Sequence, residues 1–161
     1  MARHEIATLG FDDLAVGDEW ESASRTITET DVVNFAGLSG DFNTLHMDHE
    51  QARQGPFGKP VAHGLLGLAV VSGLTSHYPR TETLAFLGII EWKFLRPITF
   101  GDTVRVLSKV VELETRSRGR RGVVTWQRQL LNQHGQVLQE GLTQTLVRSR
   151  RPQTSDVETS E

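Results

Sequence analysis

The sequence contains no cysteine among its 161 residues. Disulfide bonds, thiolate metal ligands and a cysteine nucleophile are therefore excluded. Long hydrophobic runs are also missing, because the longest, from about Leu65 to Leu74, is too short to span a bilayer. The first residues show no apolar signal core. We therefore expect a cytoplasmic protein without a membrane partner.

An excess of positive charge is absent as well. The chain carries 17 Lys and Arg against 20 Asp and Glu, a net charge of −3. A protein that neutralises nucleic-acid phosphates needs a basic surface, so we expect no nucleic-acid partner. The sequence has no Gly-rich phosphate loop, no Gly-x-Ser-x-Gly motif and no dinucleotide fingerprint, which predicts no bound cofactor. Four histidines, His4, His49, His77 and His134, are not arranged at metal-ligand spacing, and the His46-x-x-His49 pair lacks supporting acidic or sulfur ligands, so we predict no metal site.

What the chain does have is an ordinary globular composition, with 37% apolar and 23% charged residues. We predict a single domain over residues 1–149. From residue 150 to 161 the chain has too little apolar surface to order itself, so we predict a disordered C-terminal tail there.

Helical patterns occupy the first half. Thr28 and Asp31 have the spacing of a capping box, and the apolar residues after them predict a short helix that ends at Gly40. Asp48 is placed to cap a further turn. A long apolar helix is predicted between about residues 63 and 77. Because apolar residues cover nearly all its faces, we expect this helix to be buried against a sheet.

Strand patterns occupy the second half, at residues 84–95, 103–114, 123–132 and 136–147. A turn near Gly135 separates the last two. Long consecutive strands favour antiparallel pairing, so the pattern alone predicts an α+β fold.

One stretch brings a carboxylate, an imidazole, a glycine turn and a helix start close together in the sequence. In order, it contains Phe35, Ser39-Gly40-Asp41-Phe42-Asn43, Leu45-His46, Phe57-Gly58 and Ala62-His63-Gly64. A later segment reads Phe94-Leu95-Arg96-Pro97-Ile98-Thr99-Phe100-Gly101-Asp102-Thr103. Together they resemble the MaoC-like family of (R)-specific enoyl-CoA hydratases and hydroxyacyl-thioester dehydratases. The chain departs from the family pattern at Thr44, where a proline is usual, and we expect this to loosen the loop.

The resemblance implies a hot-dog fold, in which a curved antiparallel β-sheet wraps a long central helix. It also implies a homodimer, or a higher homo-oligomer, with each substrate tunnel near the interface. The substrate would be an acyl-CoA or an acyl-carrier thioester. Coenzyme A would then be part of the substrate, and no separate cofactor is expected.

Asp41 and His46 are the candidate catalytic pair. Hydration of an unsaturated thioester needs a base, an acid and donors for the charge that develops on the carbonyl oxygen. A carboxylate and an imidazole on one short loop can hold a water molecule between them. The structural alternative is an Asx turn at Asp41 and a buried, hydrogen-bonded His46. Which of the two acts as the base stays open, because a coupled pair can share the role.

Four further residues are candidate substrate-binding groups. Gly64 opens the long helix, and its family counterpart donates to the oxyanion, although tight packing would also explain a glycine there. Asn43 would orient the Asp41 loop. His63 would add a polar group or a structural hydrogen bond. Ser72, about two turns beyond Gly64, lies on roughly the same helix face or bonds back to a helix carbonyl.

Binding of a coenzyme A diphosphate requires cations. Lys59, Arg96 and an arginine cluster are all candidates, and the sequence does not choose among them; the cluster comprises Arg116, Arg118, Arg120 and Arg121. The walls of an acyl tunnel are equally open. Candidates are Phe42, Leu65, Leu68 and Val71, which would serve equally as core residues.

The sequence thus predicts a hydro-lyase that reversibly hydrates trans-2-enoyl-CoA or enoyl-carrier thioesters to (R)-3-hydroxyacyl thioesters. Two alternatives remain. One is a hot-dog acyl-CoA thioesterase, although such enzymes usually use a lone carboxylate from the helix region. The other is a non-catalytic subunit that binds acyl thioesters, which the intact Asp41 and His46 disfavour.

Overall fold

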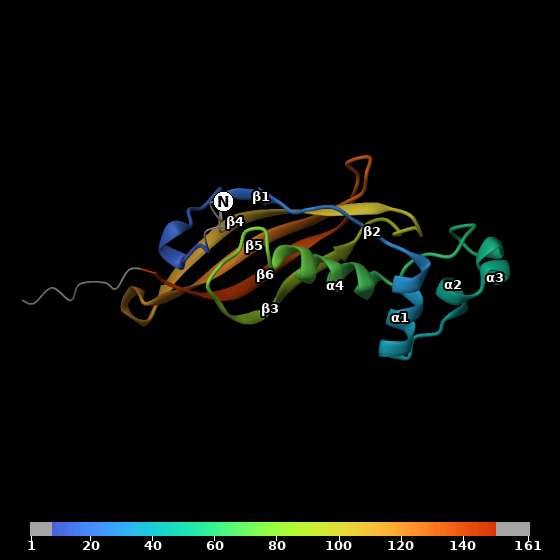
Figure 1. Cartoon of the computed structure of the whole chain (residues 1–161), viewed down its shortest axis with the longest axis horizontal. Helices are drawn as coiled ribbons and strands as arrows, with labels where there is room; N and C mark the ends of the chain where they lie inside the picture. Colours follow the sequence, from blue (N-terminus) through green and yellow to red (C-terminus); the bar gives the residue numbers. More distant parts are fainter. Residues whose placement is uncertain (1–7, 151–161) are drawn as a thin grey trace, which may run out of the picture.

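The computed structural model describes residues 8–150 of the chain. Its centre is a six-stranded antiparallel sheet in the order β1-β4-β5-β6-β3, with β2 paired to β4 (Figure 1). The strands are β1 (Glu19–Glu21), β2 (Arg25–Thr26), β3 (Thr83–Phe94), β4 (Thr103–Arg116), β5 (Arg121–Leu131) and β6 (Val137–Arg148). The four predicted long strands and their antiparallel pairing are confirmed. Strand β3 ends the sheet, beside β6 and far from β4.

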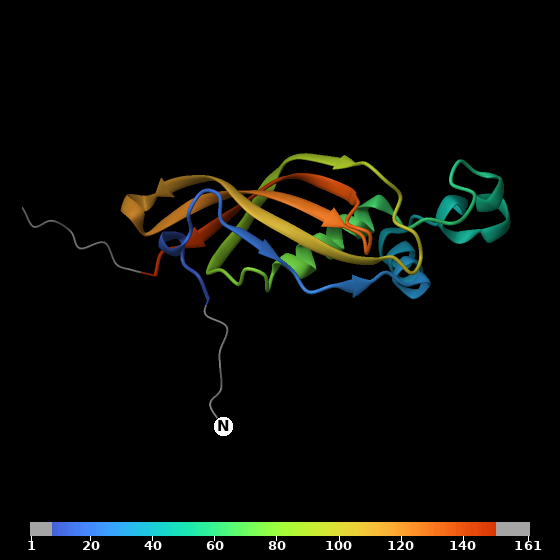
Figure 2. The ribbon, with the colours of Figure 1, turned by 90° about the horizontal axis from the view of Figure 1, so that it is seen from above.

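Four α-helices and two short 3-10 helices complete this part of the chain. They are α1 (Glu29–Ser39), α2 (Thr44–Met47), α3 (His49–Gln54), α4 (Gly64–Thr75), η1 (Phe11–Asp13) and η2 (Ser117–Gly119). Figure 2 shows α4 lying against the curved sheet, while α2 and α3 project beyond one end of it. This is the α+β, hot-dog arrangement that was predicted.

The helix ends follow local sequence rules. The Thr28 hydroxyl accepts a hydrogen bond from the Asp31 amide, and the Asp31 carboxylate accepts one from the Thr28 amide. The predicted capping box is therefore confirmed. Gly40 ends α1 with a left-handed φ of 78°, a conformation that glycine adopts without steric cost. Asp48 caps α3 through the amides of Glu50 and Gln51. These polar contacts fix where the chain turns around the candidate site.

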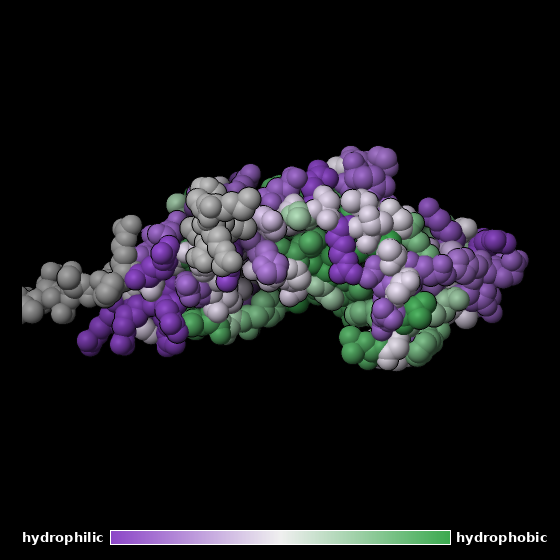
Figure 3. Space-filling view, in the orientation of Figure 1, coloured by the Kyte–Doolittle hydropathy of each residue, from purple (hydrophilic) through white to green (hydrophobic). Residues whose placement is uncertain are grey.

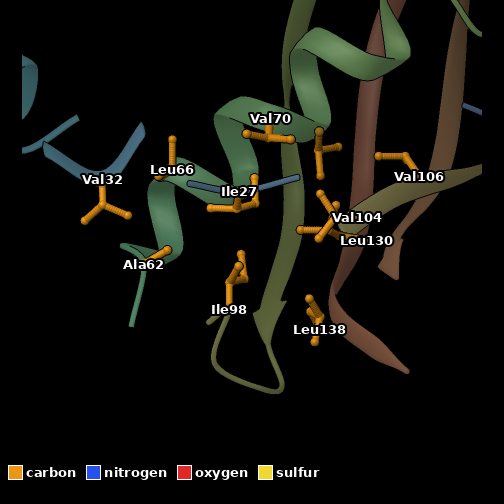
Figure 4. Packing of buried hydrophobic residues seen from close by; sticks show 11 residues of the cluster. Ile27, Val32, Ala62, Leu66, Val70, Ile98, Val104, Val106, Leu130 and Leu138 are labelled. Atoms are coloured by element: carbon orange, nitrogen blue, oxygen red, sulfur yellow. The ribbon is translucent and has the colours of Figure 1, made fainter. Parts of the chain in front are cut away.

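The main core lies between α4 and the inner face of the sheet (Figure 4). Leu66, Val70 and Val71 of α4 are buried there. They belong to one cluster with residues of the sheet and of the connections, namely Ile27, Val32, Ala62, Ile98, Val104, Val106, Leu130 and Leu138. Burial of each large aliphatic side chain stabilises the fold by roughly 1.5–3 kcal/mol.

The predicted burial of the long helix against a sheet is confirmed for one face of α4 only. Leu65 is 61% exposed, whereas the next residue, Leu66, is 8% exposed. Only one face of α4 meets the sheet, and nothing in residues 8–150 covers the opposite face. Apolar residues also gather over β3 and over α1, on either side of a hollow in the surface (Figure 3).

The predicted C-terminal tail lies outside the described residues except for Arg150. The backbone amide of Arg150 donates to Asp12 at 2.7 Å. Within the described residues, no helix is long and apolar enough to cross a membrane.

Candidate active site

The loop after α1 presents Asp41. Gly40 turns the chain, and the Ser39 hydroxyl accepts from the Asp41 amide at 3.2 Å while donating to the Phe35 carbonyl at 2.7 Å. The Asp41 carboxylate accepts the Asn43 amide at 3.2 Å, which is the Asx turn considered as a structural role. Its side chain is still 53% exposed. The turn therefore holds the carboxylate in place without removing it from solvent.

His46 lies on α2, which Asn43 begins. The Asn43 side chain accepts from the Leu45 amide at 2.9 Å and so caps this helical turn. Thr44 occupies the first helical position. The segment between Asp41 and His46 is thus a capped turn. The loosening expected from the missing proline stays a prediction.

The orientation of the His46 ring is set by the backbone of Val61. His46 Nδ1 lies 2.7 Å from the Val61 carbonyl oxygen. A carbonyl only accepts hydrogen bonds, so Nδ1 carries the proton. In the neutral ring the unprotonated nitrogen is then Nε2. This nitrogen is available to accept a proton.

His63 connects α4 to the Asp41 loop. It is 2% exposed, and its ring stacks on His46 with centroids 3.8 Å apart. His63 Nε2 donates to the Asp41 carbonyl oxygen at 2.9 Å. The Phe35 ring packs against the His63 ring, with 5.0 Å between the ring centroids. The structural role considered for His63 is therefore what the contacts show.

The side chains of Asp41, His46 and His63 form one cluster. One ligand atom from each lies within 4.8 Å of the others. Asp41 and His46 are thus close enough to bind the same water molecule. The same three groups would be the ligands if a metal ion bound here, and the absence of a metal stays a prediction.

Gly64 is the first residue of α4. The side chain of the N-cap residue, His63, makes no capping hydrogen bond, and the amides of this helix start carry the partial positive charge of a helix N-terminus. A Cβ at Gly64 would lie 2.9 Å from the Phe94 ring. Glycine is needed here for close packing, and it also leaves the amide end open. Both interpretations of Gly64 fit the structure.

A cleft of about 270 Å³ joins His46 to Gly64. Arg96 lines this cleft, and it also lines a neighbouring cleft of about 390 Å³ that contains Lys59. The arginine cluster around η2 lies at the opposite end of the sheet from α2 and α3 (Figure 1). Of the candidate cations, the structure brings Lys59 and Arg96 to the site within one chain.

Ser72 is not part of this cluster. It lines a separate, larger cavity of about 490 Å³, together with Leu65, Leu68 and Val71 but without Asp41 or His46. Sequence analysis missed Arg128, which also lines this cavity. Arg128 lies two residues from both Trp126 and Leu130 on β5 and therefore shares their face of the strand. This period-two pattern was the available signal that it faces inward.

A model of the family described as "MaoC like domain" matches residues 13–131. Protein MaoC of Klebsiella aerogenes is 36% identical over 96 residues, which are 60% of this chain but 29% of that longer protein. The (R)-specific enoyl-CoA hydratase of Rhodospirillum rubrum is 31% identical over 114 residues, 70% of this chain and 77% of that protein.

A solved structure supports the same relationship. The monoamine oxidase regulatory protein from Archaeoglobus superposes with a TM-score of 0.82 and 36% identity, covering 89% of this chain and 97% of that one. The matched range contains α1, the Asp41 loop, α2 and the start of α4, so it includes every residue of the cluster. The chain therefore belongs to the MaoC-like domain family.

Proposed function

We propose that the chain is a hydro-lyase that reversibly adds water to trans-2-enoyl-CoA or enoyl-carrier thioesters and forms (R)-3-hydroxyacyl thioesters. The observation that carries this proposal is the placement of Asp41 and His46 within 4.8 Å of each other. The named activity of the Rhodospirillum relative supports both the reaction and its stereochemistry.

Asp41 and His46 would hold the attacking water. His46 Nε2 is the free acceptor of the ring, because Nδ1 donates to Val61. The exposed Asp41 carboxylate accepts the second hydrogen of the same water. As the water oxygen bonds to C3, its proton passes to this pair, and the pair returns a proton to C2. Both new bonds then form on one face of the alkene.

The uncapped start of α4 would stabilise the developing enolate oxygen. The amide of Gly64 points from a positive helix end, and hydrogen-bond donors fixed where charge develops are an effective source of rate enhancement. His63 would act as a positioning residue, because its bond to the Asp41 carbonyl ties the loop to this helix end.

Lys59 and Arg96 would bind the phosphates of coenzyme A. Arg96 borders both the cleft that contains His46 and the cleft that contains Lys59. A thioester in the first cleft would therefore place its polar end toward the second. Arg96 donates to the Val137 carbonyl at 2.7 Å, which orients its side chain.

The working form would be a homodimer. Strand β3 is a long sheet edge with exposed large apolar side chains, whereas the other edge strand, β1, has 3 residues. The exposed side chains on β3 are Leu84, Phe86, Leu87, Ile89, Ile90 and Phe94. Such an edge pairs readily with another strand. A second copy related by a twofold axis would pair β3 with β3 and cover the open face of α4. A monomer by light scattering at micromolar concentration would contradict this.

The test is an absorbance assay for loss of the conjugated enoyl thioester, with crotonyl-CoA and a longer trans-2-enoyl-CoA. Asp41→Asn and His46→Ala should each lower kcat by about 10²–10⁴-fold, the usual contribution of a positioned acid or base. His49→Ala is the matched control, because His49 is exposed and bonds to Glu29 away from the cluster. Chiral analysis of the product tests the (R) assignment.

Other outcomes would point elsewhere. Release of free thiol would establish a thioesterase. Thioester binding without any reaction would indicate a non-catalytic subunit. The cytoplasmic location and the absence of a cofactor stay predictions.

A further inference from the structure

The larger cavity lies along α4, beyond the Asp41 cluster. Its volume is about 490 Å³, within the range of small-molecule sites. It begins at Leu65, next to Gly64, and extends to Thr75 and Ser76 at the other end of the helix. Phe86 and Ile89 of β3 form one wall, beside the edge proposed to meet a second copy.

The lining changes character along the helix. Leu65, Leu68 and Ala69 line the part near Gly64, whereas Ser72 and Thr75 follow toward the C-terminal end. Thr75 lies 11 positions after Gly64, which is roughly 16 Å along a helix axis. A group that enters from Gly64 therefore meets apolar side chains first and polar ones later.

Arg128 on β5 is the charged group of this cavity. It is 9% exposed and donates to the Thr75 hydroxyl. Among residues 8–150, its Nε has no hydrogen-bond partner, and no Asp or Glu forms an ion pair with it. Burial lowers the pKa of Arg128 to about 10, so the side chain is still cationic at neutral pH.

Thr143 on β6 is a second unsatisfied group in the same place. It is 3% exposed, its hydroxyl has no hydrogen-bond partner among residues 8–150, and it lines the same cavity. A buried cation without a counter-ion is costly, and so is a buried hydroxyl without a hydrogen bond. Both costs fall if an anion occupies the cavity. A guanidinium suits a carboxylate, because its N–H groups match the two oxygens.

On the basis of the proposed function, we infer that the acyl group of the substrate carries an anionic end group, a carboxylate, which Arg128 binds with help from Thr143. The thioester carbonyl would lie at Gly64, the chain would run past Leu65 and Leu68, and its carboxylate would end between β5 and β6. Arg128 is then a specificity-determining residue for acyl thioesters derived from dicarboxylic acids.

The test compares matched pairs of trans-2-enoyl-CoA substrates that differ only at the far end, methyl or carboxylate, over a series of chain lengths. For at least one length, the wild type should show a kcat/KM at least tenfold higher for the carboxylate. Arg128→Met should lose at least a hundredfold on that substrate and gain on its methyl counterpart. Arg128→Lys, which keeps the charge but not the paired N–H groups, should fall in between.

Arg105→Met is the matched control, because Arg105 on β4 pairs with Glu21 outside the cavity. It should preserve the wild-type preference. A circular dichroism melt of each variant establishes that it is folded. If Arg128→Met does not fold, Thr143→Val takes its place. This variant replaces the hydroxyl with a methyl group and should lower the preference for the carboxylate substrate by threefold or more.

Two failures are distinguishable. If the wild type hydrates methyl-terminated substrates as well as or better than carboxylate-terminated ones at every length, this inference is wrong and the proposed function stands. If the wild type hydrates neither kind of substrate, calorimetric Kd values for the matching pairs of saturated acyl-CoA ligands test whether the cavity prefers the carboxylate. Tenfold tighter binding of the carboxylate that depends on Arg128 would support the inference without the reaction. Equal binding of the two acyl-CoA ligands would overturn the inference. A carboxylate of a second copy that already pairs with Arg128 would also overturn it.

Discussion

Helix α4 has two apolar faces that meet different surroundings. On one face, Leu66, Val70 and Val71 pack against the sheet. On the other, Leu65 is exposed and Leu68 lines the large cavity. The side chains are of the same kind, so their chemistry does not distinguish the two faces. The difference lies in what is opposite each face. One face lies against the sheet of the same chain, and the other borders the large cavity, where we propose that substrate and a second copy bind.

The two faces should respond differently to truncation. Leu66→Ala should lower the free energy of unfolding by about 2–5 kcal/mol, because it removes buried methyl groups and leaves a cavity. Leu65→Ala, one residue away, should cost less than about 1 kcal/mol in the unfolding of the chain itself, measured by urea denaturation. Its effect should appear instead as weaker dimerisation on dilution in light scattering. Equal losses of chain stability would contradict the comparison.

The glycines of α4 provide a second matched pair. A Cβ at Gly67 would overlap the Gln139 amide and Ile98, so Gly67→Ala should destabilise by about 1–3 kcal/mol through overpacking. A Cβ at Gly73 would meet no atom within 4 Å. Gly73→Ala should therefore stabilise by about 0.4–1 kcal/mol, because alanine loses less backbone entropy on folding. Both values come from denaturant unfolding. A loss at Gly73 would show that a second copy packs closely there.

The buried face also depends on the connection that carries Ile98. Partial burial raises the pKa of the Asp102 carboxyl, but hydrogen bonds from Thr99 and Gln133 and the charge of Lys59 outweigh it, so the pKa lies below its ordinary value of 3.8. A lowered pKa means that the folded state favours the ionised form. The resulting stabilisation is present above pH 3.8 and is lost as the pH falls through the folded-state value.

Asp102→Asn tests this dependence. The wild type should be more stable than the variant near neutral pH, by about 1.5–3 kcal/mol for hydrogen bonds to a charged group. The difference should shrink as the pH falls below the ordinary carboxyl range. Chemical denaturation at several pH values measures it. A difference that does not change with pH would show that ionisation of Asp102 contributes nothing.

The smallest effect is expected at Thr44, at the start of α2. Thr44 occupies the first helical position of α2, which suits proline. An N–H at this position has no acceptor within the helix, so its loss costs no helical hydrogen bond. Thr44→Pro should stabilise by about 0.4–1 kcal/mol by restricting the unfolded chain. Because Asn43 already caps this turn, kcat should change little. Thr44→Ala controls for loss of the hydroxyl, and a large rise in kcat would show that the turn is loose in the working enzyme.

Local sequence was sufficient for much of the fold and of the site. The capping box at Thr28, the stop at Gly40 and the cap at Asp48 depend on contacts within a few residues, and all are present. The four long strands follow from the distribution of apolar residues. Asp41 and His46 were predicted as a pair because their motif is continuous in the chain, and their side chains lie in one cluster.

Other features needed contacts between distant segments. The stacking of His63 on His46 and its bond to Asp41 join residues up to 22 positions apart. Arg128 bonds to Thr75 across 53 positions. A local pattern can indicate that Arg128 faces inward, but it does not show which distant residue lies opposite, because the partner is set by how the segments pack.

The sequence by itself determined the elements and their caps, since these depend on backbone hydrogen bonds and periodicity within one segment. It also led to the prediction of Asp41 and His46 as a pair, through the resemblance that their motif carries. Only the tertiary structure decided which face of α4 stays open, that β3 ends the sheet, and that a buried arginine faces a cavity. These are set by how the segments pack, because burial and the cost of an unpaired charge are defined by neighbours that come from elsewhere in the chain.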